Sequence, residues 1–499
     1  MNNFAEILAF ALYLIVVVTI GVFFYFKSRK SDGGDKMYFL GGRQMNGWVA
    51  ALSAGASDMS AWVLMGLPGS IYAYGMGQIW ISIGLFIGTL CAWLFVAPGL
   101  RRFSMIADDS ITIPQYLTRR FKSESKSLQI ICAVIFVVAY CIYAASSIVA
   151  CGNLFNTVFG MDTKTAMIGA TIIILVYTFF GGFNAVCWTD FIQGMLMLMA
   201  LMTVPIVVTI IMGQADFAPL AQVVTSENYY NVLSSGKLDW QSISDILSGL
   251  GWGLGYMGMP HILVRFMAIR SEKEMKKSRV IGTCWTFVIL GMASVVALVA
   301  HEYLGTYLDV DSRSLVFIVL VRRIFPAFIA GVLLSAILAA SMSTADSQLL
   351  ASSSAFASDV YKPVFRKKAT NREMLWAGRI VVIIISIVAL LIAMSPNCKG
   401  IMDLVECAWA AFGAAFGPAI LLSLHWKRLT YKGAVAGIVT GFAVDALWYI
   451  FLSDFTNIYE IIPGFICSFI VAVIVSKLDK KPSSEILEMF ERAKMPVEK

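Results

Sequence analysis

An acidic residue lies within an apolar stretch near the start of the chain, which reads ALSAGASDMSAWVLMG over residues 51–66. Asp58 is accompanied there by the hydroxyls of Ser53, Ser57 and Ser60. An ionised aspartate near the centre of a membrane helix costs about 2.5–3.5 kcal/mol on insertion scales, so Asp58 indicates a functional site. Small residues also allow membrane helices to pack closely, which is the alternative explanation of the serines.

A second polar face lies in the stretch LSAILAASMSTADSQLLASSSAF, residues 334–356. Ala340, Ser343, Thr344 and Ser347 are spaced i, i+3, i+4 and i+7, so they share one face of a helix. Their hydroxyls either bond back to their own helix or supply hard oxygen ligands to a small cation, together with carbonyls freed by an interrupted helix. Because soft and nitrogen ligands do not converge in these stretches, an alkali ion fits better than a transition metal.

The elements that must position these residues are predicted to be membrane helices. The chain has 499 residues, of which 59% are hydrophobic and 14% charged, whereas soluble domains are about 25% charged. Long apolar runs recur near the roughly 20 residues that cross a bilayer. They are continuous, unlike the alternating segments of a membrane β-barrel. The net charge of +7 does not indicate nucleic-acid binding, because the basic residues gather in alternate loops, as the positive-inside rule describes for cytoplasmic loops.

Thirteen spans are predicted, and this odd number places the N-terminus outside and the C-terminus inside. Arg322 and Arg323 lie in an external loop against the usual charge bias, so a short surface helix is expected there. The tail after Pro482 is expected to form a solvated cytoplasmic helix. The thirteen spans are residues 5–26, 45–70, 73–99, 127–155, 163–182, 185–213, 241–267, 278–304, 327–355, 374–394, 400–424, 431–451 and 456–476.

Two of these spans, 45–70 and 241–267, are poor helices. The second reads SGLGWGLGYMGMPHIL, with five glycines ahead of Pro260. An interior glycine costs about 1 kcal/mol relative to alanine, and a proline removes a backbone donor. Both spans are therefore predicted to be interrupted near the midplane. Because they lie five spans apart, the chain is predicted to contain two inverted five-helix repeats, whose broken helices line the binding site of a secondary transporter.

This repeat gives the expected organisation of the chain. An extra helix with its cytoplasmic loop comes first, followed by the first repeat, an external loop, the second repeat, two further helices and a cytoplasmic tail. The boundaries of these six parts are residues 1–43, 44–213, 214–239, 240–426, 427–478 and 479–499.

Cysteine and histidine provide no sign of a metal cluster or an enzyme. The nine cysteines include no CxxC pair and are expected to be reduced, packed thiols. His261, His301 and His425 lie in three separate regions without a nucleophile or a metal-binding set beside them. The protein is therefore not expected to be an enzyme.

Five long motifs carry a family resemblance: FLGGRQMNGWVAALSAGASDMSAWVLMGLPG, GGFNAVCWTDFIQ, WGLGYMGMPHILVRFMAIRS, GVLLSAILAASMSTADSQLL and AWAAFGAAFGPAILLSL. They resemble the sodium/solute symporter family, and within it most closely the sodium/proline symporters. The resemblance extends from about Tyr38 to Lys427. It implies an all-α LeuT-type core of two inverted five-helix repeats with one helix in front, which agrees with the count of spans.

The resemblance implies a sodium site where the second and ninth spans meet. Asp58 then lies beside the ion. Asp346 departs from the family pattern, in which a neutral residue is expected, and it either adds negative potential or forms a supporting pair. Glu406 is a second departure, and it leaves open whether a proton or a second cation takes part. The implied sodium ligands are the backbone oxygens of Ala56, Met59 and Ala340 and the hydroxyls of Ser343 and Thr344.

The resemblance also implies a solute pocket beside the two breaks. Proline is a zwitterion with a small apolar ring, so the N-terminus of a broken helix can receive its carboxylate, while aromatic faces attract its ammonium and bury its ring. Aromatic residues in membrane helices also serve as packing or interface anchors. The implied pocket residues are Ser60, Trp62, Tyr143, Trp252, Tyr256 and Pro260.

The expected function is sodium-driven import of L-proline across a bacterial inner or plasma membrane by a multi-pass protein, with sodium as the co-transported ion. Neither nucleic acid nor an obligate protein partner is expected. Alternatives are symport of another osmolyte, a sialic acid, a sugar or pantothenate, or, in a different class, a solute sensor. A sensor would carry a kinase-like extension, and nothing substantial is expected after Lys477.

Overall fold

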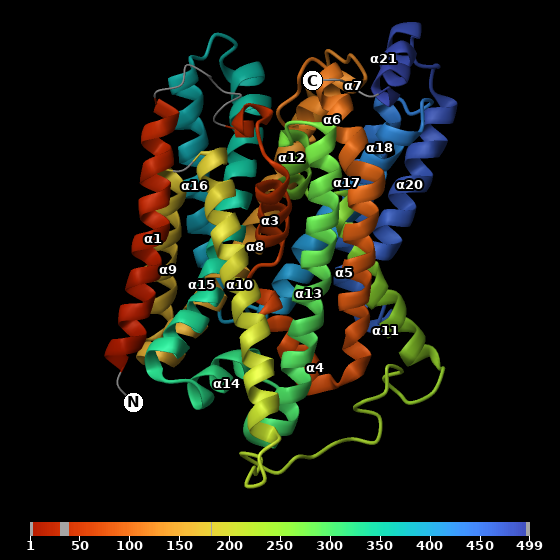
Figure 1. Cartoon of the computed structure of the whole chain (residues 1–499). Coiled ribbons are helices and arrows are strands. Elements are labelled where there is room, and N and C mark those ends of the chain that lie inside the picture. Colours follow the sequence, from red (N-terminus) through yellow and green to blue (C-terminus); the bar gives the residue numbers. More distant parts are fainter. Residues whose placement is uncertain (1–2, 30–38, 181, 496–499) are drawn as a thin grey trace.

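The computed structural model describes residues 3–29, 39–180 and 182–495. Helices run along a common axis and form one bundle, with the N-terminus and the C-terminus at opposite ends (Figure 1). The long helices are α1 (Asn3–Arg29), α5 (Ile79–Cys91), α8 (Ser127–Phe159), α9 (Thr163–Phe180), α10 (Phe183–Met212), α13 (Glu272–Leu304), α15 (Ala327–Ala355), α16 (Asn371–Ala393), α17 (Ile401–His425), α18 (Tyr431–Phe451) and α20 (Ile461–Leu478).

Two predicted spans are interrupted, as expected from their sequences. The first consists of α3 (Gly47–Asp58), a single 3-10 turn η2 (Ala61–Val63) and α4 (Gly66–Tyr74). The second consists of α11 (Trp240–Gly251), the 3-10 segment η5 (Trp252–Met257) and α12 (Pro260–Ala268). Pro260 occupies the first turn of α12, where its missing donor costs nothing, so the proline begins a helix and does not kink one.

Glycines allow η5 to pack directly on its neighbours. A Cβ atom at Gly253 would lie 2.3 Å from the backbone oxygen of Gly84 in α5. A Cβ atom at Gly255 would lie 2.0 Å from Nε1 of Trp409 in α17. These glycines therefore weaken the helix and at the same time bring the break against two other helices.

Ten of the described helices are long and apolar enough to cross a membrane. The three other predicted spans correspond to the two interrupted ones and to α9, which is counted among the shorter apolar helices. The third span is longer than predicted, because α5 continues through a π-helical segment η4 (Ala92–Val96) into α6 (Ala97–Ile106). Arg101 near its end is held by the backbone oxygens of Ile269 at 2.7 Å and Arg270 at 2.9 Å.

The centre of the bundle contains α3, α8, α10, α12 and α15. Helix α15 packs against α1, α8 and α10, and α3 packs against α10 and α13. Helix α17 packs on α8 and η5, while α18 and α20 pair with each other and cover α17. This arrangement places the break in the first span between α15 and the second interrupted span.

Two short helices differ in part from expectation. The helix expected at Arg322 is α14 (Val316–Ile324), but one face of it is buried, and Arg322 pairs with Glu6 at 3.1 Å. The tail helix α21 (Ser484–Lys494) was expected to be solvated, and this is wrong for one face. Phe490 is buried there. Its ring lies 6.0 Å from that of Phe103 in α6 and covers the Arg120 guanidinium, 5.1 Å from the ring centroid, so α21 packs on α6.

Candidate functional site

Asp58 joins the two interrupted spans. It is the last residue of α3, and its backbone oxygen accepts hydrogen bonds from Trp62 Nε1 at 3.3 Å and the Tyr143 hydroxyl at 3.2 Å. Its carboxylate oxygen Oδ2 accepts a hydrogen bond from the Tyr256 hydroxyl of η5, whereas Oδ1 is buried and has no hydrogen-bond partner among the described residues. The backbone at the end of α3 therefore binds Trp62 and Tyr143, while the Asp58 carboxylate binds Tyr256 in the second interrupted span.

Aromatic rings form the wall around this break. The rings of Trp62 and Trp252 lie 6.2 Å apart, and those of Tyr256 and Trp409 lie 5.0 Å apart. Trp409 Nε1 also donates to the backbone oxygen of Trp252 at 2.7 Å, which fixes η5 on α17. Such faces suit an organic cation with an apolar body.

Trp252 also faces a wide cavity of about 620 Å³ that reaches to the ends of α11, α17 and α18. Five carboxylates and two basic side chains line it, so its charge is mainly negative. These charged residues are Asp245, Asp403, Glu406, Asp454, Glu460, Arg313 and Lys399. The cavity leads from one end of the bundle to the aromatic wall.

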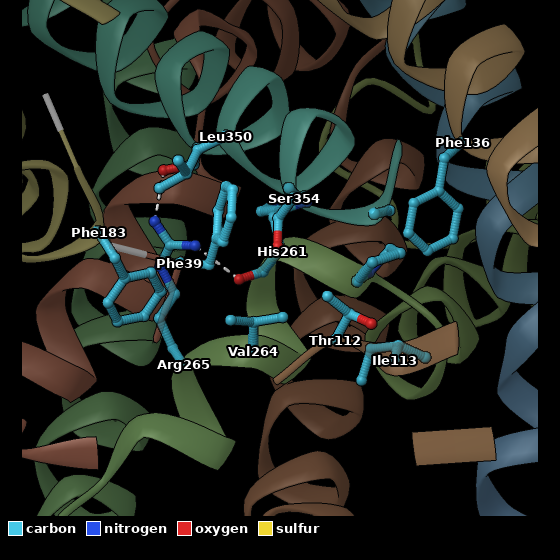
Figure 2. A pocket seen from close by; sticks show the side chains of 14 residues that line it. Phe39, Thr112, Ile113, Phe136, Phe183, His261, Val264, Arg265, Leu350 and Ser354 are labelled. Carbon is cyan, nitrogen blue, oxygen red and sulfur yellow. Dashed lines mark hydrogen bonds between the residues drawn. The ribbon is translucent and has the colours of Figure 1, made fainter. Parts of the chain in front are cut away.

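The six predicted solute residues all lie at or beside the two breaks. Ser60 caps η2, with its hydroxyl accepting from the Trp62 backbone N at 3.4 Å. Pro260 begins α12 directly after the second break and lines a small cavity of about 20 Å³. Figure 2 shows this second cavity, with Thr112, His261 and Arg265 around it.

The predicted sodium ligands of α3 and α15 also meet. The Ser343 hydroxyl lies 2.9 Å from the backbone oxygen of Ala56 and 3.1 Å from that of Ala340, and its one proton can be donated to either. The Thr344 hydroxyl is buried without a hydrogen-bond partner in the described part of the chain. Met59 caps the end of α3, one turn beyond Ala56. Hard oxygens from both helices therefore converge where the unwound backbone begins.

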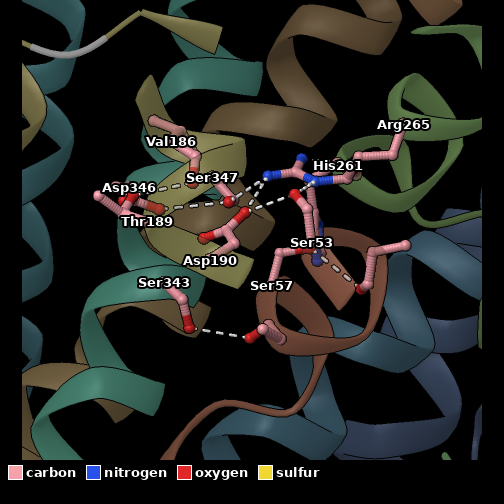
Figure 3. Close-up of polar contacts among 12 residues, drawn as sticks. Ser53, Ser57, Val186, Thr189, Asp190, His261, Arg265, Ser343, Asp346 and Ser347 are labelled. Carbon is pink, nitrogen blue, oxygen red and sulfur yellow. Dashed lines mark hydrogen bonds and ion pairs between the residues drawn. The ribbon is translucent and has the colours of Figure 1, made fainter. Parts of the chain in front are cut away.

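A buried ion pair lies next to these oxygens. Arg265 of α12 binds Asp190 of α10 at 3.0 Å, and both side chains are almost fully buried. Arg265 also donates to the hydroxyls of Ser53 at 3.0 Å and Ser347 at 2.5 Å, and Ser53 donates to Asp190 at 2.6 Å (Figure 3). This network links α3, α10, α12 and α15. It was not predicted, although a charge inside an apolar span was a visible signal at Arg265 and at Asp190.

The opening serines thus have three different roles. Ser53 belongs to the ion-pair network, Ser60 caps a turn, and the Ser57 hydroxyl bonds back to the Ala54 oxygen at 3.1 Å. Ser57 therefore bonds within its own helix. Asp346 accepts from Ser347 at 3.2 Å, and Figure 3 shows its side chain pointing toward α10.

The histidines are placed apart. His261 Nδ1 lies 3.3 Å from the Tyr140 hydroxyl, His301 stacks on Tyr229, and His425 lies at the end of α17. All nine cysteines are free. Among the described residues, no three His, Cys, Asp or Glu side chains gather closely enough to hold a metal ion.

The model of the sodium:solute symporter family matches residues 38–441. The chain belongs to this family. Its members are transporters, and the ten apolar helices agree with a multi-pass protein of the cell membrane.

Curated relatives of the symporter cover nearly its whole length. It is 42% identical to the osmoregulated proline transporter OpuE of Bacillus subtilis over 97% of each chain. It is 43% identical to the high-affinity proline transporter PutP of the same organism, over 95% of this chain and 98% of the relative. It is 40% identical to the sodium/proline symporter of Salmonella typhimurium, over 98% of this chain and 96% of the relative.

Solved structures show the fold of the symporter. A sodium-coupled sialic acid symporter in a substrate-bound, outward-open state superposes with a TM-score of 0.77 at 20% identity, covering 96% of this chain and 99% of that one. The nucleobase-cation symporter Mhp1 superposes with a TM-score of 0.54 at 12% identity, covering 91% and 98%. The symporter therefore has the all-helical, LeuT-like fold of these sodium-coupled and cation-coupled transporters.

Proposed function

We propose that this symporter couples inward movement of sodium to uptake of L-proline by alternating access. The observation that carries the proposal is the identity of 40–43% with three proline transporters over at least 95% of the chain. The two sites described above supply the chemistry for both cargoes. Inward movement of one charge yields about 2.3 kcal/mol per 100 mV of membrane potential, which is available to concentrate the solute.

Sodium binds, in this proposal, between the end of α3 and the middle of α15. The contact of Ser343 with the Ala56 and Ala340 oxygens supports this position, because these two carbonyl oxygens and the hydroxyl oxygen can all bind a small cation once the hydroxyl hydrogen turns away. The unpartnered Thr344 hydroxyl adds a further oxygen, and the backbone of Met59 is freed by the break. All five ligands are hard oxygens, as an alkali ion prefers.

Proline binds at the two breaks, between Trp62 and Tyr143 on one side and Trp252 and Tyr256 on the other. The free Oδ1 atom of Asp58 supports a place for the ammonium there, since it is buried and lacks a donor. Asp58 then connects the proline site with the sodium site, because it lies in the same last turn of α3 as Ala56, whose backbone oxygen is a proposed sodium ligand. Pro260 lies directly after the second break, where it begins α12 beside this pocket.

Thirteen crossings arranged as two inverted repeats are supported by how the helices pair. In an inverted repeat, each helix of residues 44–213 has a counterpart in residues 240–426: α3 corresponds to η5, α5 to α13, α8 to α15 and α10 to α17. Each contact between two helices should then be matched by a contact between their counterparts. The contact of α3 with α13 is matched by that of η5 with α5, the contact of α3 with α10 by that of η5 with α17, and the contact of α8 with α17 by that of α15 with α10. Termini at opposite ends of the bundle fit an odd number of crossings, with the N-terminus outside (Figure 1).

An outward-facing state is supported by the closure of the opposite end. Residues Met45 and Ile269, next to α3 and α12, form a backbone bridge. Arg43 donates to the Met267 backbone oxygen at 2.6 Å and pairs with Asp109 at 2.8 Å. Release of the cargo to the cytoplasm then requires these contacts to open, and the wide cavity beyond Trp252 to close.

Uptake of labelled L-proline into proteoliposomes tests the proposal. An imposed inward sodium gradient is expected to drive accumulation, and an equal choline gradient is expected to drive none. The Ser343→Ala variant at the same protein density is the matched control for the sodium site. Equal uptake in choline, or accumulation of sialic acid, a sugar or pantothenate in place of proline, would contradict it.

A sialic acid substrate is the second candidate, because the superposed structure with a TM-score of 0.77 is a sialic acid symporter. Its identity of 20% is half that to the proline transporters, so proline is the better-supported solute. A solute sensor would bind proline without moving it, and the same vesicles distinguish this outcome because bound label does not exceed the amount of protein.

A further inference from the structure

Two buried carboxylates outside the proposed sodium and proline sites lack a positive partner among the described residues. Asp445 of α18 is 4% exposed and Glu460, which caps the start of α20, is 2% exposed. Asp445 Oδ1 and Glu460 Oε1 are buried and have no hydrogen-bond partner in the described part of the chain. An isolated charge in such surroundings is costly, so each carboxylate needs a bound cation or a proton.

Asp445 and Glu460 both belong to the contact of α18 with α20. A Cβ atom added to Gly464, one turn after Glu460, would lie 3.3 Å from the Asp445 Cβ atom. Asp445 therefore lies about one helical turn from Glu460, and Glu406 of α17 lines the same wide cavity as Glu460. Glycines at this crossing bring the helices together, so the carboxylates cannot both be ionised without strong repulsion.

The nearest positive group does not neutralise them. Lys399 lies 4.6 Å above the ring of Tyr449 and forms no hydrogen bond or ion pair with Asp445 or Glu460. Other titratable groups around the pair are mostly acidic or neutral. The groups that face it from the neighbouring segments are Lys399, Asp403, Glu406 and Cys407 of the α17 region, Tyr449 and Asp454 of the α18 region, and Tyr459.

Glu460 is reached from one end of the bundle. It lines the wide cavity of about 620 Å³ that Trp252 also lines, so a cation can reach it by the route proposed for the cargo. Tyr459 connects this position to the solute pocket: its hydroxyl donates to the backbone oxygen of Glu406 at 2.8 Å, and its ring lies 5.2 Å from that of Trp252.

We propose that Asp445 and Glu460 together bind one exchangeable monovalent cation, a proton or a sodium ion, at a site separate from that between α3 and α15. A divalent ion fits less well, because it requires six or more oxygen ligands, and no three acidic, His or Cys side chains of the described residues gather as a metal group. Through Tyr459, occupancy of this site biases the position of Trp252, so the cation acts on solute binding as well.

Cation stoichiometry of the purified symporter tests this. Binding of radiolabelled sodium without proline, and proton binding by potentiometric titration between about pH 4 and about pH 9, are measured on the wild type, Glu460→Gln and Asp445→Asn. Each variant is expected to lose one bound cation per chain in one of the two assays. Loss of sodium identifies a sodium site, and loss of a proton with unchanged sodium binding identifies a proton site.

Three variants control the test. Asp454→Asn removes an exposed carboxylate of the same cavity and is expected to leave both counts unchanged. Glu460→Asp retains the charge and is expected to retain the cation, which separates loss of the site from misfolding. Ser343→Ala is expected to lose the sodium bound at α15 and to keep the cation at Glu460, whatever the transported solute is. The proposal is overturned if Glu460→Gln and Asp445→Asn bind as many sodium ions and protons as the wild type. It is also overturned if Asp454→Asn loses as many bound cations as they do.

Discussion

Tyr256 donates a hydrogen bond to the carboxylate of Asp58, so the two broken helices are joined through one phenol and one carboxylate. The residues lie 198 positions apart in the sequence, in the two interrupted spans. A cargo that binds at this bond can therefore change the position of both breaks at once. In a transporter of this architecture, such a connection lets solute binding act on the sodium site.

Replacing Tyr256 by Phe keeps the ring and removes this bond. A hydrogen bond to a charged group contributes about 1.5–3 kcal/mol, so proline half-saturation is expected to rise about 10–150-fold. Sodium binding measured without proline is expected to change much less, because Ser343 and Ala56 do not contact Tyr256. Tyr449→Phe, which removes a phenol away from the breaks, is the control. An unchanged half-saturation for proline would show that this hydrogen bond does not contribute to solute binding.

Asp58→Asn retains the shape of the side chain and removes its charge. We expect normal membrane insertion, since an intramembrane carboxylate is costly, together with loss of sodium-driven proline uptake. Counterflow of proline at equal sodium on both sides then distinguishes loss of coupling from loss of binding. Full sodium-driven uptake at normal expression would show that the Asp58 charge is dispensable.

Ser343→Ala and Thr344→Ala each remove one proposed sodium ligand. The expected cost of about 1.5–3 kcal/mol corresponds to a fall in sodium affinity of about 10–150-fold. The half-saturation for sodium in proline uptake reports this change. Ser341→Ala is a matched control, because that hydroxyl bonds back to the Ile337 oxygen of its own helix at 2.9 Å. If both variants retain the wild-type sodium dependence, the ion does not bind there.

The buried pair of Arg265 and Asp190 predicts a stability effect. Removing one partner leaves an uncompensated buried charge, and such changes cost about 3–5 kcal/mol. Asp190→Asn and Arg265→Gln are therefore each expected to lower the thermal unfolding temperature of the purified protein. The double variant is expected to unfold at a higher temperature than either single variant, because it leaves no lone charge. Additive losses in the double variant would show that the residues contribute independently.

The interrupted spans could be predicted because their cause is local. Five glycines and Pro260 disfavour a helix wherever they occur, so the break in the second span follows from the sequence alone. The pairing of Arg265 with Asp190 could not be predicted in this way, since the residues are 75 positions apart and meet only through the packing of α10 and α12. Each of these two charged residues nevertheless lies within an apolar span, which indicates that it needs a partner.

Asp445 and Glu460 were missed for a different reason. Both lie near the ends of predicted spans, where a charge usually reaches water and costs little. Only the close contact of α18 with α20 shows that the two carboxylates are buried. The tail helix α21 was misjudged similarly, because the burial of Phe490 depends on Arg120, a residue of another segment.

Trp252 separates the wide cavity from the solute pocket, and its truncation should act on proline more than on sodium. Trp252→Ala removes an aromatic face of the proposed solute pocket, and an aromatic contact with a cation contributes about 0.5–2 kcal/mol. Proline half-saturation is therefore expected to rise about 2–30-fold. Binding of sodium and proline is linked reciprocally, so sodium affinity measured with proline present falls as well, whereas sodium binding without proline is retained. Trp80→Ala, which removes an indole at the start of α5 that donates to the Val232 backbone oxygen, controls for loss of a large aromatic side chain. Intact proline binding combined with loss of proline-free sodium binding in Trp252→Ala would place the solute away from η5.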